Sequence, residues 1–178
     1  MIRLILNFKN SVLQKNKGFT LIEILIFMGI FSILITVMLQ LFTAIFDNQL
    51  ESQSTTAVST DSRYIENKLT ADIKNATSSS ILSPAIGASS SALSISNGSS
   101  TYTYSLSGNN LVVNEQPAGT TDQLNSVNTK VSSLNFFRLA DNSGQDISTI
   151  TVSFTLTSGT IKRSGAVSED FNFTAGTR

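Results

Sequence analysis

Residues 19–46 read FTLIEILIFMGIFSILITVMLQLFTAIF, a run in which Glu23 is the one charged residue. The 23 residues from Ile24 to Phe46 carry no charge, and as an α-helix they rise about 35 Å. The hydrocarbon core of a bilayer is about 30 Å thick. The run therefore predicts a helix that crosses a membrane once, with some tilt.

A basic segment precedes this apolar run. Its four basic residues, with no acidic residue among positions 1–18, are Arg3, Lys9, Lys15 and Lys17. The whole chain has twelve basic and twelve acidic residues, so residues 19–178 hold eight basic against twelve acidic ones. A basic flank before an apolar span is typical of a segment whose N-terminal end stays in the cytoplasm. No clustered basic stripe of the kind that binds nucleic acid is evident, and no nucleic-acid partner is expected.

The composition also restricts the chemistry that the chain can perform. It contains no Cys and no His, so a Ser-His-Asp or Cys-His catalytic site is excluded, and a zinc hydrolase nearly so. No spacing in the sequence suggests a Ser-Lys or carboxylate pair in their place. The chain is therefore expected to be no enzyme and to need no cofactor or metal.

Beyond Phe46 the sequence becomes polar, but no Pro or Gly occurs from Ile30 to Ser83. Apolar residues recur at helical spacings: Val58, Tyr64/Ile65, Leu69, Ile73 and Ala76. We expect one helix from about residue 19 to about residue 77, with a membrane-spanning first half (19–46) and an amphipathic second half (47–77). Ser52–Thr60 is rich in Ser and Thr, which are weak helix formers, and a bend is expected there.

Residues 78–178 alternate short apolar positions with Ser, Thr, Asn and Gly. This pattern predicts an antiparallel β-rich domain with strands at 92–96, 102–106, 111–113, 131–139 and 147–156, and an edge strand around Phe171 and Phe173. Asn97-Gly98 is a strong hairpin signal, and Gly108-Asn109-Asn110 marks the next turn. The fold class is α+β, with the amphipathic half of the helix packed on a small antiparallel sheet. Of the adjacent Phe136 and Phe137, one must point outward.

The junction between the basic and apolar segments reads Lys17-Gly18-Phe19-Thr20-Leu21-Ile22-Glu23. It closely resembles the cleavage and methylation signature of type IV prepilins, the family that includes pilins and secretion pseudopilins. The resemblance covers residues 15–46. It implies that a prepilin peptidase cuts after Gly18, removes the leader 1–18 and methylates the new amine of Phe19.

The same resemblance gives Glu23 a role in assembly. In the family this carboxylate is thought to pair with the N-terminal amine of a neighbouring subunit, here that of Phe19. A buried charge in a membrane helix is costly, and the pair offsets that cost at the correct axial step. In the unassembled chain Glu23 lies near enough to the helix start to reach the cytoplasmic interface. Glu23→Val is expected to insert normally and to assemble poorly.

Two features narrow the resemblance within the family. Major pilins often carry a helix-kinking Pro near the position of Gln40, and this chain has none before Pro84. The order of helix, serine-rich break and strand meander resembles J-type pseudopilins more loosely. The implied function is a structural minor pilin or pseudopilin of a type IV pilus or type II secretion pseudopilus. It implies these partners: the prepilin peptidase, other pilins, the inner-membrane assembly platform and membrane lipid.

Three alternatives stay open at this point. The chain could be a signal-anchored surface interaction protein that never polymerises, with an uncut Gly18 and a tolerant Glu23. A secretory signal peptide is less favoured, because no small-x-small cleavage site follows the apolar run. Asp141–Asp146 faintly resembles a calcium loop, but Val152 stands where the bidentate acid belongs, which favours a solvated turn.

Overall fold

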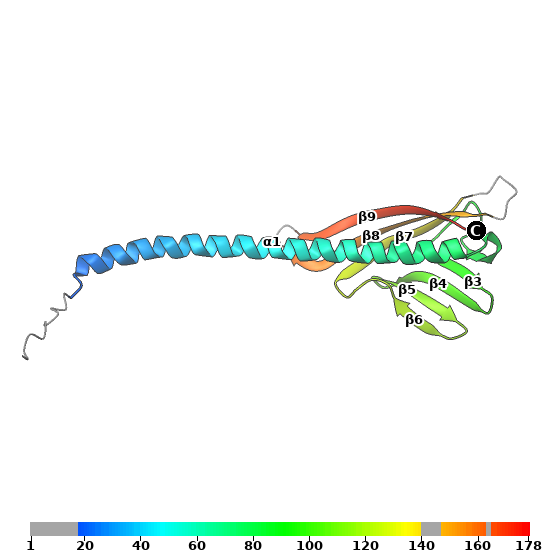
Figure 1. The fold of residues 1–178 in the computed structure, drawn as a ribbon, viewed down its shortest axis with the longest axis horizontal. Coiled ribbons are helices and arrows are strands. Elements are labelled where there is room, and N and C mark those ends of the chain that lie inside the picture. The colour runs from blue at the N-terminus through cyan, green and yellow to red at the C-terminus, as the bar shows by residue number, and fades with distance from the viewer. Residues whose placement is uncertain (1–17, 140–146, 163–164) are drawn as a thin grey trace, which may run out of the picture. The chain divides into compact units, whose positions relative to one another are not determined.

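The computed structural model describes residues 18–139, 147–162 and 165–178. The chain divides into two compact units, Met1–Ala44 and Ile45–Arg178. Helix α1 (Leu21–Asn75) begins in the first unit and ends in the second (Figure 1). The expectation of a single helix over both halves is confirmed, and so is the α+β class. Asp141–Asp146, considered above as a calcium loop, lies outside the described residues.

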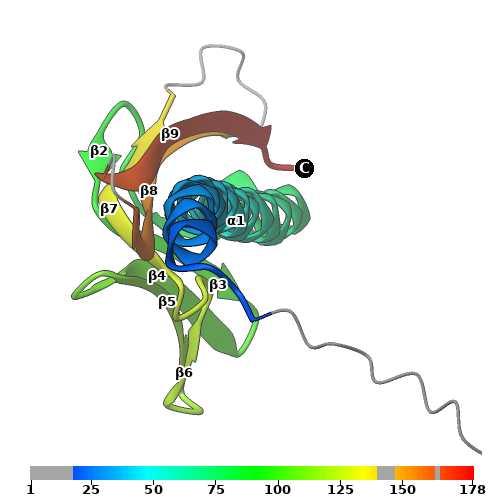
Figure 2. The same ribbon diagram turned by 90° about the vertical axis from the view of Figure 1, so that its left-hand side faces the viewer.

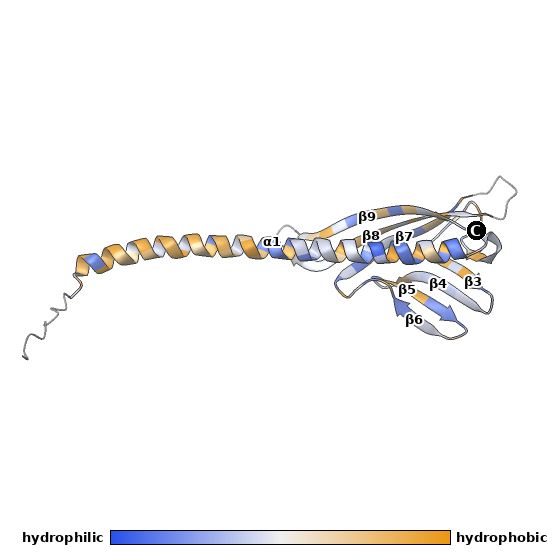
Figure 3. Cartoon of the chain, in the orientation of Figure 1, coloured by the Kyte–Doolittle hydropathy of each residue, from blue (hydrophilic) through white to orange (hydrophobic). Residues whose placement is uncertain are grey.

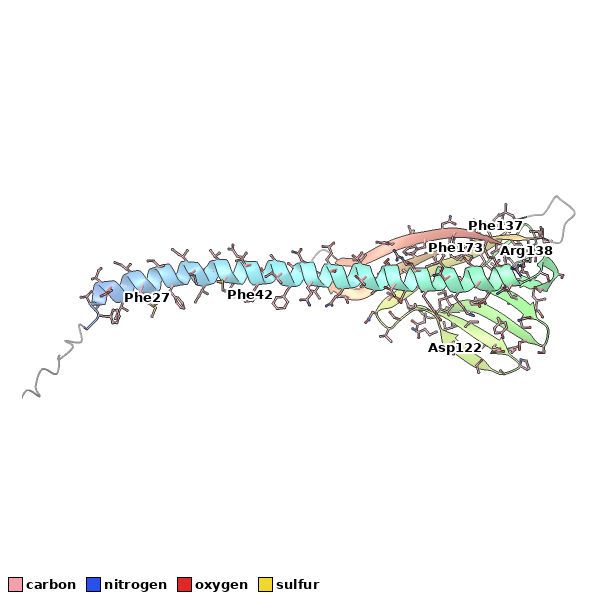
Figure 4. All side chains as sticks on the ribbon, in the orientation of Figure 1. Phe27, Phe42, Asp122, Phe137, Arg138 and Phe173 are labelled. Atoms are coloured by element: carbon pink, nitrogen blue, oxygen red, sulfur yellow. The ribbon has the colours of Figure 1, made fainter. Side chains whose placement is uncertain are left out.

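In the first unit, the described residues form the N-terminal half of α1. Every residue from Gly18 to Ala44 is exposed, and the colouring by hydropathy shows this part of the helix as almost uniformly hydrophobic (Figure 3). The side chains of Phe27 and Phe42 project away from the helix axis (Figure 4). The rings of Phe27 and Phe31 stack with their centroids 5.8 Å apart. The apolar side chains of this unit therefore have no core of their own to enter.

The serine-rich part of α1, Ser52–Thr60, where the sequence favoured a bend, is continuous helix. Ser54 Oγ donates to Leu50 O at 2.8 Å, and Ser62 Oγ donates to Ser59 O at 3.0 Å. These hydroxyls donate to backbone carbonyls in the preceding turn of the same helix, so they do not draw the backbone into a non-helical conformation. Ser54 is also buried, at 1 % exposure.

The second unit adds two antiparallel sheets to the C-terminal half of α1. A short 3₁₀ turn (Ser78–Ser80) leads into the first sheet, of order β1-β3-β4-β5-β6. Its strands are β1 (Ile81–Ser83), β3 (Leu93–Asn97), β4 (Ser100–Ser107), β5 (Asn110–Gln116) and β6 (Thr120–Gln123). The second sheet has the order β2-β7-β8-β9. Its strands are β2 (Ser89–Ser90), β7 (Thr129–Arg138), β8 (Thr149–Lys162) and β9 (Gly165–Gly176).

Within this unit α1 lies between the two sheets, with β7, β8 and β9 on one side and β3, β4 and β5 on the other (Figures 1 and 2). The amphipathic stripe predicted from the sequence is buried: Val58, Ile65, Leu69 and Ile73 are each 0 % exposed. Tyr64, the other candidate for the stripe, is 53 % exposed. The stripe and the inner faces of both sheets form one hydrophobic cluster, so the helix is the shared centre of the domain.

The strand meander is present, but its first turn sits one residue further along than predicted. Asn97 pairs with Ser100, which leaves Gly98-Ser99 as the central residues in place of Asn97-Gly98. Gly98 has φ +61°, and Gly108, first in the next turn, has φ +62°. Glycine at the first central position suits this backbone conformation at no steric cost. The glycine therefore sets the register of each hairpin.

Strand β7 contains a bulge that the sequence analysis did not predict. The pairing with β8 shifts between Ser132 and Asn135, and Ser133 has φ 54°. Val131 and Leu134 are both buried, although an unbroken strand would point them to opposite faces. The bulge inserts one residue and restores the inward phase. It also places Phe136 at 0 % and Phe137 at 37 % exposure, so the outward member of the pair is Phe137.

Two buried polar side chains connect these layers. Asp61 on α1 accepts hydrogen bonds through Oδ2 from the Ser126 amide at 2.8 Å, from Ser126 Oγ at 2.7 Å and from Thr129 Oγ1. The loop containing Ser126 joins the two sheets. Arg138, labelled in Figure 4, donates to Ser78 O at 2.8 Å and to Ile81 O at 3.0 Å. Each side chain ties the helix region to a strand or loop far away in sequence.

Candidate processing and assembly site at the helix N-terminus

The predicted site lies where α1 begins. Gly18, Phe19 and Thr20 precede the first helical residue, Leu21. The Ile24 amide donates to Thr20 O at 3.2 Å, and the Glu23 amide donates to Thr20 Oγ1 at 3.3 Å. Thr20 is therefore the N-cap residue, and its hydroxyl satisfies one amide that the first turn leaves without a partner. The Gly18–Phe19 bond lies outside the helix.

Gly18 is open on all sides among the described residues. A Cβ added to it would meet no atom within 4 Å, and no left-handed φ is recorded for it. Phe19 is 78 % exposed. The local fold of the described residues therefore does not require glycine at position 18.

Glu23 occupies the third position of the helix and is exposed. An acid in the first turn interacts favourably with the positive end of the helix dipole. Within the described part of the chain, Glu23 forms no ion pair, and the one salt bridge found there joins Lys68 and Asp72 at 3.0 Å. Its carboxylate lies beside a shallow groove lined by Phe19, Glu23, Ile24 and Phe27. The acid therefore has a free side and apolar neighbours.

The helix behind the site has the length and composition to cross a membrane. Its exposed apolar side chains continue from Phe19 through Phe46. Side chains of this kind are stable in lipid or against another apolar surface, and unstable in water. The apolar helix and the motif before it fit a membrane-anchored protein.

Comparison with known protein families bears directly on this segment. Residues 13–39 match the family model described as the prokaryotic N-terminal methylation motif. The N-terminal segment is type IV prepilin-like. Gly18, Phe19 and Glu23 all fall inside the match, and the prepilin motif suggests a substrate of a prepilin peptidase and a structural class of protein. No curated protein and no solved structure matched the chain.

The resemblance predicted from Lys17 to Glu23 is thus confirmed at the level of the prepilin-like family. The looser likeness to J-type pseudopilins stays a prediction. The sequence analysis overlooked Thr20 as a site residue. The signal was present, because Thr20 and Glu23 have the spacing of a capping box.

Proposed function

We propose that this chain is a structural minor pilin or pseudopilin. A prepilin peptidase removes residues 1–18 and methylates the amine of Phe19. The mature helix holds the protein in the cytoplasmic membrane as a single pass, with the second unit outside. The protein then joins other pilins, through the assembly platform, in a type IV pilus or a type II secretion pseudopilus.

The observation that carries the proposal is a methylation motif at the start of a helix whose apolar side chains are all exposed from Leu21 to Phe46. Cleavage before the apolar segment leaves that segment attached to the mature protein, whereas secretory signal cleavage would remove it. The exposed helix can then exchange lipid for the helices of neighbouring subunits. Both surroundings are apolar, so this exchange needs no change in the helix surface.

The surroundings of Glu23 support its proposed role in assembly. Cleavage creates a positive amine at Phe19, which a neighbouring subunit can bring to the carboxylate. A carboxylate without an intramolecular ion pair, located at the edge of an apolar span, favours such a partner because an unpaired charge in lipid is costly. Glu23 would thus oppose filament entry until a neighbour supplies the amine.

The main alternative is a signal-anchored surface interaction protein that does not polymerise. N-terminal sequencing and intact mass of the membrane-extracted protein separate the two functions. With a prepilin peptidase present, the mature chain should begin at N-methylated Phe19. Recovery of the intact leader from such cells would overturn the proposal.

A pair of glycine variants makes this test specific. Gly18→Val should retain the leader, because the peptidase must bind the chain closely at the cut. Gly29→Val makes the same change at another glycine with open space around it and should be processed normally. Equal processing of both variants would remove the assigned role of Gly18.

Glu23→Val tests assembly apart from cleavage. The variant should be inserted and cut like the wild type, and its recovery in sheared filaments should fall at least about tenfold, the effect of losing roughly 1.4 kcal/mol. Glu66→Gln, which changes an exposed acid further along α1, serves as the control. Normal incorporation of Glu23→Val would show that this carboxylate does not direct assembly.

A further inference from the structure

Gln40 stands out among the residues of the apolar span. It is exposed, like the rest of that part of the helix, and its side-chain amide forms no hydrogen bond among the described residues. Gln40 lies six residues before Phe46, so it is about 9 Å inside the end of the uncharged run. An amide has two donor hydrogens and an acceptor oxygen, and lipid satisfies none of them.

The three hydroxyl-bearing residues of the span already have hydrogen-bond partners. Ser32 Oγ donates to Gly29 O at 3.1 Å, Thr36 Oγ1 to Ser32 O at 2.9 Å and Thr43 Oγ1 to Gln40 O at 2.9 Å. These bonds stay within the helix and need no partner. Past Glu23, Gln40 is therefore the polar side chain of the described span that lacks a hydrogen-bond partner.

The non-apolar residues of the run from Ile24 to Phe46 also share one face. Their spacings are 3, 4, 4 and 3 residues, and at about 100° per residue they fall within about 40° of Thr36 on either side. We call this set the polar stripe: Gly29, Ser32, Thr36, Gln40 and Thr43. The remainder of the run is apolar on all sides. Small side chains on one face allow another helix to approach closely.

We infer that the polar stripe is the contact face of a parallel helix pair formed by two copies of this chain in the membrane, with the two Gln40 amides bonded to each other. The inference goes beyond the proposed function, and it rests on membrane insertion alone. Two copies enter the bilayer in the same orientation, so identical residues lie at the same depth. A carboxamide is its own complement, because the N–H of one donates to the oxygen of the other.

The absence of Cys from the sequence allows a direct test on the full chain. Thr36→Cys places a single thiol on the polar stripe, and Leu34→Cys places one about 160° around the helix. Both variants are expressed in cells that lack a prepilin peptidase and filament subunits, and their membranes are oxidised. Thr36→Cys should give a disulfide-linked dimer, and Leu34→Cys should give little. Equal cross-linking on both faces would overturn the proposal.

The role of Gln40 is tested in the Thr36→Cys background. Adding Gln40→Leu should weaken dimerisation by about threefold to thirtyfold, which is the range for losing an interhelical hydrogen bond in a membrane. Thr43→Val is the matched control, because its hydroxyl already bonds to its own helix. Unchanged cross-linking with Gln40→Leu would overturn the inference.

Two further outcomes separate this pair from filament assembly and from other partners. Glu23→Val should leave the Thr36→Cys dimer unchanged, since Glu23 is about 140° away from Thr36 around the helix. Loss of the dimer in that variant would assign the contact to filament packing. A dimer that appears only when other filament subunits are co-expressed would also overturn the inference, because the partner would then be a different chain.

Discussion

The two halves of α1 share one continuous backbone and have opposite surroundings. From Leu21 to Ala44 every side chain is exposed. In the second half, one stripe of the helix is buried by the sheets: Ser54, Val58, Asp61, Ser62, Ile65, Leu69 and Ile73. A helix alone does not determine where its apolar side chains go. In the second half the sheets supply the cover, and in the first half none of the described residues does.

The arrangement of apolar residues along the sequence predicts this difference. The second half alternates apolar and charged residues at helical spacing, which predicts a helix with one covered face. The first half is apolar all round apart from the polar stripe, which predicts surroundings that are apolar on every side. In the proposed function, cleavage at the prepilin-like motif, which lies within residues 13–39, leaves this segment on the mature protein.

The largest expected effect comes from the same substitution made in each half. Leu69→Ala removes a side chain that is 0 % exposed, and it should lower the free energy of unfolding of the second unit by about 2–5 kcal/mol through the cavity it leaves. Leu39→Ala, at 60 % exposure, should change it by less than about 0.5 kcal/mol. Urea unfolding in detergent, followed by tyrosine fluorescence, measures both, since the three tyrosines are Tyr64, Tyr102 and Tyr104. Equal effects of the two variants would contradict the statement that the second half of α1 packs in a core and the first half does not.

An intermediate effect is expected at the polar contact between α1 and the loop joining the sheets. Asp61→Ala leaves the donors of Ser126 and Thr129 without their acceptor, and Thr129 is 2 % exposed. The second unit should lose about 1.5–3 kcal/mol of stability, the range for hydrogen bonds to a charged group. Asp47→Ala, an exposed acid on the same helix, should be nearly neutral in the same unfolding assay. A neutral Asp61→Ala would mean that packing alone holds the helix.

The smallest effect is a pH dependence confined to the second unit. Burial, and then the hydrogen bond to the Asp72 carboxylate, raise the pKa of Tyr104 above its ordinary value of 10.0. The folded state therefore keeps this proton where the unfolded state loses it. Stability from Tyr104 is fully present below pH 10 and falls above it, by up to about 1.4 kcal/mol per pH unit. Urea midpoints measured by circular dichroism from pH 8 to 11 should fall less in Tyr104→Phe, and identical pH profiles would contradict this account.

The features that follow from local patterns were predictable from the sequence. The helix, the meander of β3 to β5 and the inward stripe depend on periodicity and turn residues. The short strands β1, β2 and β6 were not predicted: β1 pairs irregularly with β3 and β2 pairs with the distant β7, and β6 (Thr120–Gln123) has no apolar alternation to mark it. Strand β9 extends far beyond the expected Phe171 and Phe173, because β8 supplies its whole ladder.

The bulge and the site residues show, for single positions, which features the sequence pattern indicated and which needed the structure. Val131 and Leu134 are three positions apart in the sequence, so a regular strand would point them to opposite faces. The inserted residue of the bulge lets both side chains lie inside. Thr20 was visible as the first residue of a capping box. The sequence analysis noted Gln40 only as the position near which major pilins often carry a proline. Its place on the polar stripe follows from the continuous helix that the structure shows there.

The position of α1 between two sheets has a mechanical consequence. Neither sheet has a complete core without the helix, and Asp61 holds the helix to the loop from which both sheets extend. Tension along α1 would therefore strain the contacts to both sheets together. A domain built around its helix in this way is suited to carry a load through that helix.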